Sequence, residues 1–265
     1  MVLFLFLSHL GLGIVFTLVF VSREAGVKFF RFNAGLAAAL IAVAFIFHSD
    51  PSSTAGRVAF IALAISEAAI ALYWATIGRV LASIRPAIVA VAVAAGLVAI
   101  VAQAIAAVPG GTVTLQAMTI ASFLSSAALL GGACTAMTLG HWYLILPSMT
   151  VSHLQTIVGL HIGSLVVRAV LVTAAVVLAN HTTALGLNEL GPSFHHYMTS
   201  VDGIFFWQRV LFGLAGPAVL SYLTWETAKI RSTQSATGIL YVDFFTVVVG
   251  EVLAKYILLA MRVPV

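Results

Sequence analysis

Residues 240–260 read LYVDFFTVVVGEVLAKYILLA, a stretch long and apolar enough to cross a bilayer that nevertheless carries Asp243, Glu251 and Lys255. Ionisable side chains are costly in the hydrocarbon core and normally face a protein interior or a water-filled cavity. In a helix these residues fall on one stripe, which also contains Val247 and is continued by Arg262. The stripe predicts an interior helix in which Glu251 and Lys255, one turn apart, form an ion pair.

The rest of the chain is as apolar as this stretch. It has 265 residues, of which 62% are hydrophobic and only 8% charged, and its mean hydropathy is +1.15. Soluble domains carry about 25% charged residues, so lipid must be the solvent of this chain. We therefore expect an all-α, polytopic integral membrane protein that forms a single transmembrane domain. A membrane-spanning helix needs roughly 20 apolar residues. About eight segments qualify, at residues 3–21, 33–48, 57–78, 86–108, 113–139, 154–179, 203–224 and 237–260.

Basic residues in the connecting loops predict the orientation. The loops after the first, third and seventh segments are basic, whereas the alternate loops hold Arg57 as their one basic residue. By the positive-inside rule, the basic loops are cytoplasmic and both termini are extracytoplasmic. We expect a multi-pass protein of a bacterial inner (cytoplasmic) membrane.

Two segment ends resemble each other. The third ends ALYWATIGRVLASIRP and the seventh ends LSYLTWETAKIRSTQS, each with a tryptophan ahead of basic residues. This spacing fits a weak repeat of residues 1–110 and 111–265, arranged as two parallel four-helix bundles. The alternative is that both ends independently collect interfacial anchors, as membrane helices often do.

Three further charged residues offer partners for the stripe at residues 243–255. Glu67, Arg168 and Arg209 lie inside the third, sixth and seventh predicted helices, at depths compatible with Glu251. We expect one connected polar cluster. It is either an ion-pair network that holds the helices together, or a proton path or polar pocket for a membrane-soluble ligand. Intramembrane charges so often mark ion, proton or substrate pathways that we favour the second interpretation.

Histidines supply a second set of candidates. His195 and His196 lie in the longest predicted loop, where they could exchange protons with a quinol or titrate without consequence. A haem b would need two axial histidines at similar depth on facing helices, and His161 has no such partner, so haem is not favoured. With Cys134 as the one cysteine and no H-E-x-x-H motif, no metal site is predicted.

The last helix resembles that of a known group. QSATGILYVDFFTVVVGEVLAKYIL, residues 234–258, is similar to the final helix of the NrfD, polysulfide reductase and dimethyl sulfoxide reductase membrane anchors, where an acidic GE pair precedes a basic residue. Gly250, Glu251 and Lys255 match this pattern, although that group has arginine as often as lysine at the last position. GHWYLILP, residues 140–147, also resembles loops of these anchors.

The resemblance implies a cofactor-free subunit that binds quinone near the extracytoplasmic face and exchanges electrons with an iron–sulfur or cytochrome partner. We therefore predict a membrane subunit of a respiratory or electron-transfer oxidoreductase complex that anchors its redox partners and has no catalytic residue of its own. A secondary transporter or proton channel, a haem b cytochrome and a purely structural anchor are the alternatives. Broken helices would favour transport, and Pro217 could kink the seventh helix. The candidate quinone and proton-pathway residues are Glu251, Lys255, Arg168, Arg209, Asp243, Glu67, His195 and His196.

Overall fold

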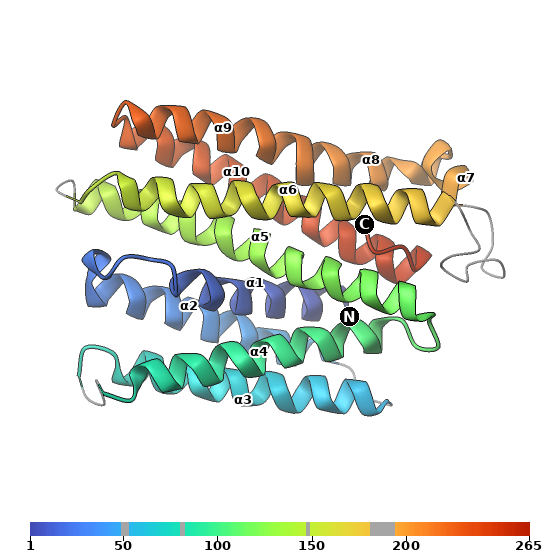
Figure 1. The fold of residues 1–265 in the computed structure, drawn as a ribbon, viewed down its shortest axis with the longest axis horizontal. Coiled ribbons are helices and arrows are strands. Elements are labelled where there is room, and N and C mark those ends of the chain that lie inside the picture. The colour runs from blue at the N-terminus through green and yellow to red at the C-terminus, as the bar shows by residue number, and fades with distance from the viewer. Residues whose placement is uncertain (49–52, 80–82, 147–148, 181–193) are drawn as a thin grey trace.

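The computed structural model describes residues 1–48, 53–79, 83–146, 149–180 and 194–265 as a bundle of helices (Figure 1). Within these ranges no strand occurs, so the predicted all-α class is confirmed. The α-helices are α1 (Val2–Leu18), α2 (Gly26–Ile46), α3 (Thr54–Thr76), α4 (Arg85–Ala107), α5 (Val113–Ile145), α6 (Ser152–Asn180), α7 (Phe194–Thr199), α8 (Ile204–Val210), α9 (Gly216–Lys229) and α10 (Thr233–Met261). The 3-10 turns Arg23–Ala25 and Val201–Gly203 precede α2 and α8, and the π-helical turn Leu211–Ala215 joins α8 to α9.

Seven helical segments in the described part are long and apolar enough to cross a membrane, which makes the chain a multi-pass membrane protein. The first predicted segment, residues 3–21, also forms a helix, but this helix, α1, has only 17 residues and is shorter than the other seven. The second predicted segment begins earlier than expected, at Gly26 rather than at residue 33, because Lys28 and Arg31 lie within α2. Long basic side chains are good helix formers and can extend toward the membrane surface from a helical position.

The helices form two groups of four in chain order. In the first group, α1 contacts α2, α2 contacts α3, α3 contacts α4 and α4 contacts α1; in the second, α5, α6, α9 and α10 are joined in the same cyclic way. Figure 1 shows the first group in blue to green below the second in green to red. The groups meet where α1 packs against α5, with smaller contacts from α4 to α5 and from α1 to α10.

The seventh membrane segment is distorted in its middle. Pro217 has no N–H to donate to the Gly213 carbonyl oxygen, and the preceding turn widens so that the Gly216 N–H donates to the Leu211 carbonyl oxygen. Such π-helical turns are rare and are often found at functional sites. The distortion expected at Pro217 is thus a π-helical turn, and this turn begins two residues after Arg209.

Candidate functional site

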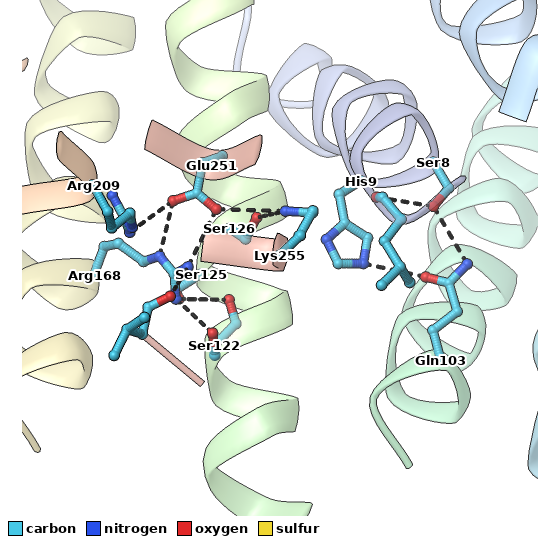
Figure 2. A network of polar contacts seen from close by, with 12 residues as sticks. Ser8, His9, Gln103, Ser122, Ser125, Ser126, Arg168, Arg209, Glu251 and Lys255 are labelled. Carbon is cyan, nitrogen blue, oxygen red and sulfur yellow. Dashed lines mark hydrogen bonds and ion pairs between the residues drawn. The ribbon is translucent and has the colours of Figure 1, made fainter. Parts of the chain in front are cut away.

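Glu251 lies at the centre of a buried ion-pair network in the second group of helices (Figure 2). Arg168 on α6 binds its carboxylate through two contacts, Nε to Oε1 at 3.0 Å and Nη2 to Oε2 at 3.2 Å. Arg209 on α8 donates from Nη2 to Oε1 at 2.9 Å, and Lys255 Nζ lies 3.5 Å from Oε2. We call these four residues the Glu251 cluster.

Every member of the Glu251 cluster is buried, with at most 2% of its surface exposed. The four come from α6, α8 and α10, so the cluster joins three membrane segments. At their usual protonation states, three cations surround one carboxylate. Burying a charge without a partner is very costly, which explains why all three cations converge on the one anion available in the cluster.

Serines on α5 complete the coordination of the cations. Arg168 Nη1 donates to the Ser122 hydroxyl at 2.6 Å and to its carbonyl oxygen at 3.2 Å, and Lys255 Nζ donates to the Ser126 hydroxyl at 2.7 Å. Ser122 and Ser126 are one helical turn apart and therefore face the same side of α5. Arg168 Nη2 also donates to the Val265 carbonyl oxygen at 3.1 Å. The serines were not among the predicted site residues.

Two glycines allow Arg209 to reach Glu251. A Cβ atom on Gly213 would collide with Arg209 Nη1, and one on Gly250 would collide with Gly213 itself and lie 3.2 Å from Arg209 Nη1. The backbones of α10 and the π-helical turn can approach only because both positions lack a side chain. Arg209 Nε and Nη1 are buried and have no hydrogen-bond partner among the described residues.

Asp243 lies two turns before Glu251 on the same face of α10, but it contacts a histidine of α6 and does not join the Glu251 cluster. His161 Nε2 on α6 lies 2.9 Å from Asp243 Oδ2, and neither side chain is exposed. The two atoms are close enough for an ion pair when the imidazole is protonated, although they are not aligned as a hydrogen bond. His161 was considered in the sequence only as a haem ligand, and its pairing with Asp243 was missed.

A third buried polar contact faces Lys255 from the first group of helices, as Figure 2 shows. His9 Nε2 on α1 lies 3.2 Å from the Gln103 side-chain oxygen on α4, and the Gln103 amide donates to the Ser8 hydroxyl at 3.4 Å. Polar side chains are therefore present on both sides of the boundary between the two groups of helices. No sequence pattern pointed to this contact.

Besides Asp243, three further predicted site residues lie apart from the Glu251 cluster. Glu67 is half-buried on α3, which packs against α2 and α4, and its Oε2 has no hydrogen-bond partner within the described ranges. The expectation that Glu67 belongs to one connected cluster is wrong, because it lies in the other group of helices. His195 and His196 are exposed on α7. Arg262 does not continue the stripe at residues 243–255, because α10 ends at Met261 and Arg262 adopts a left-handed conformation.

A groove on the outer surface of the bundle lies beside the Glu251 cluster. It has a volume of about 580 Å³ and runs between α5 and α6. Ser125 in the groove donates to the Ser122 carbonyl oxygen at 3.0 Å, and the same oxygen accepts from Arg168. The groove wall is thus connected to the cluster through hydrogen bonds. Its lining residues are Ser125, Ala128, Thr156, Gly159, Leu160, Gly163, Ser164 and Val167.

Among the residues that the structure describes, no three His, Cys, Asp or Glu side chains are grouped so that they could hold a metal ion. Comparisons of the chain with models of protein families, with characterised proteins and with solved structures found no match. The resemblance to the NrfD, polysulfide reductase and dimethyl sulfoxide reductase anchors therefore stays a prediction.

Proposed function

We propose that the chain is a membrane subunit of an electron-transfer complex that binds a quinol in the groove between α5 and α6, next to the Glu251 cluster. The observation that carries this proposal is the cluster itself. Four ionisable side chains are held by three membrane segments without exposure to solvent. Ionisable groups inside a membrane bundle are expensive and are typical of proton, ion or substrate pathways.

The groove is lined mainly by apolar surface, which suits the ring of a quinol, and three of its lining residues carry hydroxyls. The hydroxyls of Ser125, Thr156 and Ser164 each donate to a carbonyl oxygen of their own helix, at 3.0, 3.0 and 2.8 Å. Their oxygens therefore retain lone pairs that can accept hydrogen bonds from quinol hydroxyls. Gly163 has no side chain to project into the groove, so a flat ring can lie against α6. The groove extends from mid-membrane toward the start of α6, whereas the resemblance implies a quinone near the extracytoplasmic face.

The Glu251 cluster supports this function because it supplies charged groups that could accept and pass on the protons of a quinol. Oxidation of a quinol releases two protons and two electrons, and the electrons need a redox partner such as an iron–sulfur or cytochrome subunit. Glu251 is the proposed proton acceptor, and Arg168 positions its carboxylate. Arg168 also donates to the Ser122 carbonyl oxygen, which accepts a second hydrogen bond from Ser125 of the groove wall. Lys255 and the Asp243–His161 pair are the further titratable groups through which protons would leave, and Arg209 stays charged and holds the Glu251 carboxylate.

Filling the groove tests the proposal. Gly163 lies in the groove and Gly238 lies on α10, and a Cβ on either would meet no atom within 4 Å. Wild-type protein, purified with its partners from native membranes, is expected to contain extractable quinone. Gly163→Leu should lower the quinone content at least about tenfold, which corresponds to about 1.4 kcal/mol of binding free energy, and the matched variant Gly238→Leu should leave it unchanged. Quinone-free wild-type complex, or full quinone content in Gly163→Leu, would reject this site.

One observation favours a second candidate, ion-coupled transport. The π-helical turn Leu211–Ala215 interrupts a membrane segment close to Arg209, and interrupted helices are frequent at the sites of transporters. The chain reconstituted alone in liposomes with an internal pH dye separates the two functions. Proton flux without any partner would support transport, and a quinol-binding subunit of an electron-transfer complex should show none.

A further inference from the structure

A second and larger hollow lies in the first group of helices. It has a volume of about 740 Å³, within the range of about 300–1,000 Å³ that small-molecule sites occupy. Most of its lining is apolar and comes from α1–α4, with valine, isoleucine, leucine, alanine, proline, glycine and phenylalanine residues. We call it the N-terminal cavity. Nothing in the function proposed for the Glu251 cluster uses this space.

The polar lining of the N-terminal cavity is basic. Among the described lining residues the polar side chains are Arg23, Tyr73 and Arg85, and none is acidic. Arg23 begins the 3-10 turn before α2, and Arg85 begins α4. These two elements start at the same end of the bundle in Figure 1. The cavity therefore has arginines at that end and apolar walls formed by residues such as Ala34, which lies about two turns along α2.

The surroundings reinforce the positive charge. The N-terminus of α4 carries the positive end of the helix dipole, which adds to the charge of Arg85. Glu24 is the one acidic residue adjoining Arg23 in sequence, and its carboxylate lies 2.8 Å from His153 Nε2 on α6. Lys28, in the first turn of α2, and Arg79, just after α3, are both exposed and add further positive charge. The start of α2 and the end of α3 lie at the same end of the bundle in Figure 1.

We propose that the N-terminal cavity binds an anionic phospholipid, with an acyl chain between α1, α2, α3 and α4 and the phosphate at Arg23 and Arg85. Arginine matches phosphate geometry and binds it through paired hydrogen bonds. Basic pockets between membrane helices on the cytoplasmic side are suited to acidic lipid head groups, and the positive-inside rule predicts that side for this end. The apolar lining accommodates a hydrocarbon chain, which a free phosphate ion would not require.

Lipid analysis of the protein purified in mild detergent tests the head-group site. Wild-type protein, exposed to equal amounts of phosphatidylglycerol and phosphatidylcholine, is expected to retain phosphatidylglycerol. The double variant Arg23→Gln/Arg85→Gln should lower that retention at least about tenfold, because two charges near the head group are lost. Lys229→Gln is the matched control, since Lys229 is an exposed cation at the same end that pairs with Glu226 at 2.6 Å. It should retain the lipid.

A cavity-filling variant tests the acyl-chain site separately. Ala34 lines the cavity and is buried, so Ala34→Phe places a ring where the chain would lie while leaving both arginines in place. It should lose phosphatidylglycerol at an unchanged size-exclusion elution volume. If Ala34→Phe fails to fold, the double arginine variant still decides whether the head-group site exists. Any one of four results would overturn the proposal. These are equal retention of phosphatidylcholine, retention of phosphatidylglycerol by the double arginine variant, a quinone as the retained molecule, and equally tight binding of inorganic phosphate.

Discussion

Glu251→Gln is expected to lower the melting temperature of the detergent-solubilised protein sharply. The change removes the one carboxylate that Arg168, Arg209 and Lys255 share, and it leaves three buried cations with no anion in the cluster. Breaking a buried ion pair by removing one partner costs about 3–5 kcal/mol, because the remaining charge is left uncompensated. Thermal unfolding monitored by tryptophan fluorescence measures the shift.

Glu226→Gln is the matched control for this prediction. Glu226 also pairs with a lysine, at 2.6 Å from Lys229 Nζ, but both side chains are more than 40% exposed. Exposed ion pairs contribute about 0–1 kcal/mol, so this variant should melt almost as the wild type does. Equal shifts for the two glutamate variants would show that burial of the Glu251 cluster does not govern its contribution.

A compensating variant separates stability from function. Glu251→Gln/Lys255→Met removes one anion and one cation together, so the net charge of the Glu251 cluster is unchanged and part of the lost stability should return. The folded double variant still lacks the proposed proton acceptor. Quinol oxidation by the intact complex should therefore be impaired in it. A wild-type rate would show that the cluster only holds the helices together.

The positions of the charged residues in the sequence were enough to predict the Glu251 cluster. The prediction failed for residues whose neighbours depend on how the helices pack. Asp243, Glu251 and Lys255 share one face of a helix, so their joint burial follows from helical geometry alone. Arg168 and Arg209 were found because cations inside membrane segments require a partner. Glu67 has a similar depth, but depth does not reveal which group of helices a residue belongs to.

The serines could not be selected from the sequence for a different reason. Hydroxyls in membrane helices often donate to carbonyl oxygens of their own helix, as Thr119 does to Leu115 at 2.7 Å. Ser122 and Ser126 look the same in the sequence, and they contact cations only because α6 and α10 bring Arg168 and Lys255 to that face of α5.

Matching contacts in the two groups of helices support the predicted repeat. Trp74 on α3 packs over Gly35 on α2, and Trp225 on α9 packs over Gly159 on α6. The amide of Gln103 on α4 donates to Ser8 on α1, and Lys255 on α10 donates to Ser126 on α5. In each pair of contacts, corresponding helices of the two groups are involved. The repeat of residues 1–110 and 111–265 stays a prediction.

The two groups of helices meet at a crossing that has the same residue types on both sides. Gly13 and Thr17 on α1 face Gly131 and Thr135 on α5, and the two threonine hydroxyls lie 2.6 Å apart. The Thr17 hydroxyl also lies 3.2 Å from the Gly131 carbonyl oxygen. Small residues at such crossings allow backbones to touch, which is a main source of helix association in membranes.

Gly13→Ala is expected to destabilise the whole protein. Its Cβ would overlap the Ala127 carbonyl oxygen and lie 2.9 Å from the Gly131 nitrogen, so α1 and α5 would have to separate. Overpacking costs about 1–3 kcal/mol where side chains can adjust, and backbone atoms have less freedom to move, so a loss at or above the top of this range is expected. Thermal unfolding in detergent measures it.

If packing at the crossing of α1 and α5 causes the destabilisation by Gly13→Ala, then Gly238→Ala should give the opposite result. Gly238 lies in α10 with nothing within 4 Å of an added Cβ, and alanine is a better helix former than glycine by about 1 kcal/mol. The control variant should therefore be unchanged or slightly more stable, while Gly13→Ala melts earlier. Because the same chemical change is made in both helices, opposite signs can arise only from what the new methyl group meets. If Gly13→Ala proved as stable as Gly238→Ala, the close crossing of α1 and α5 would not be what joins the two groups of helices.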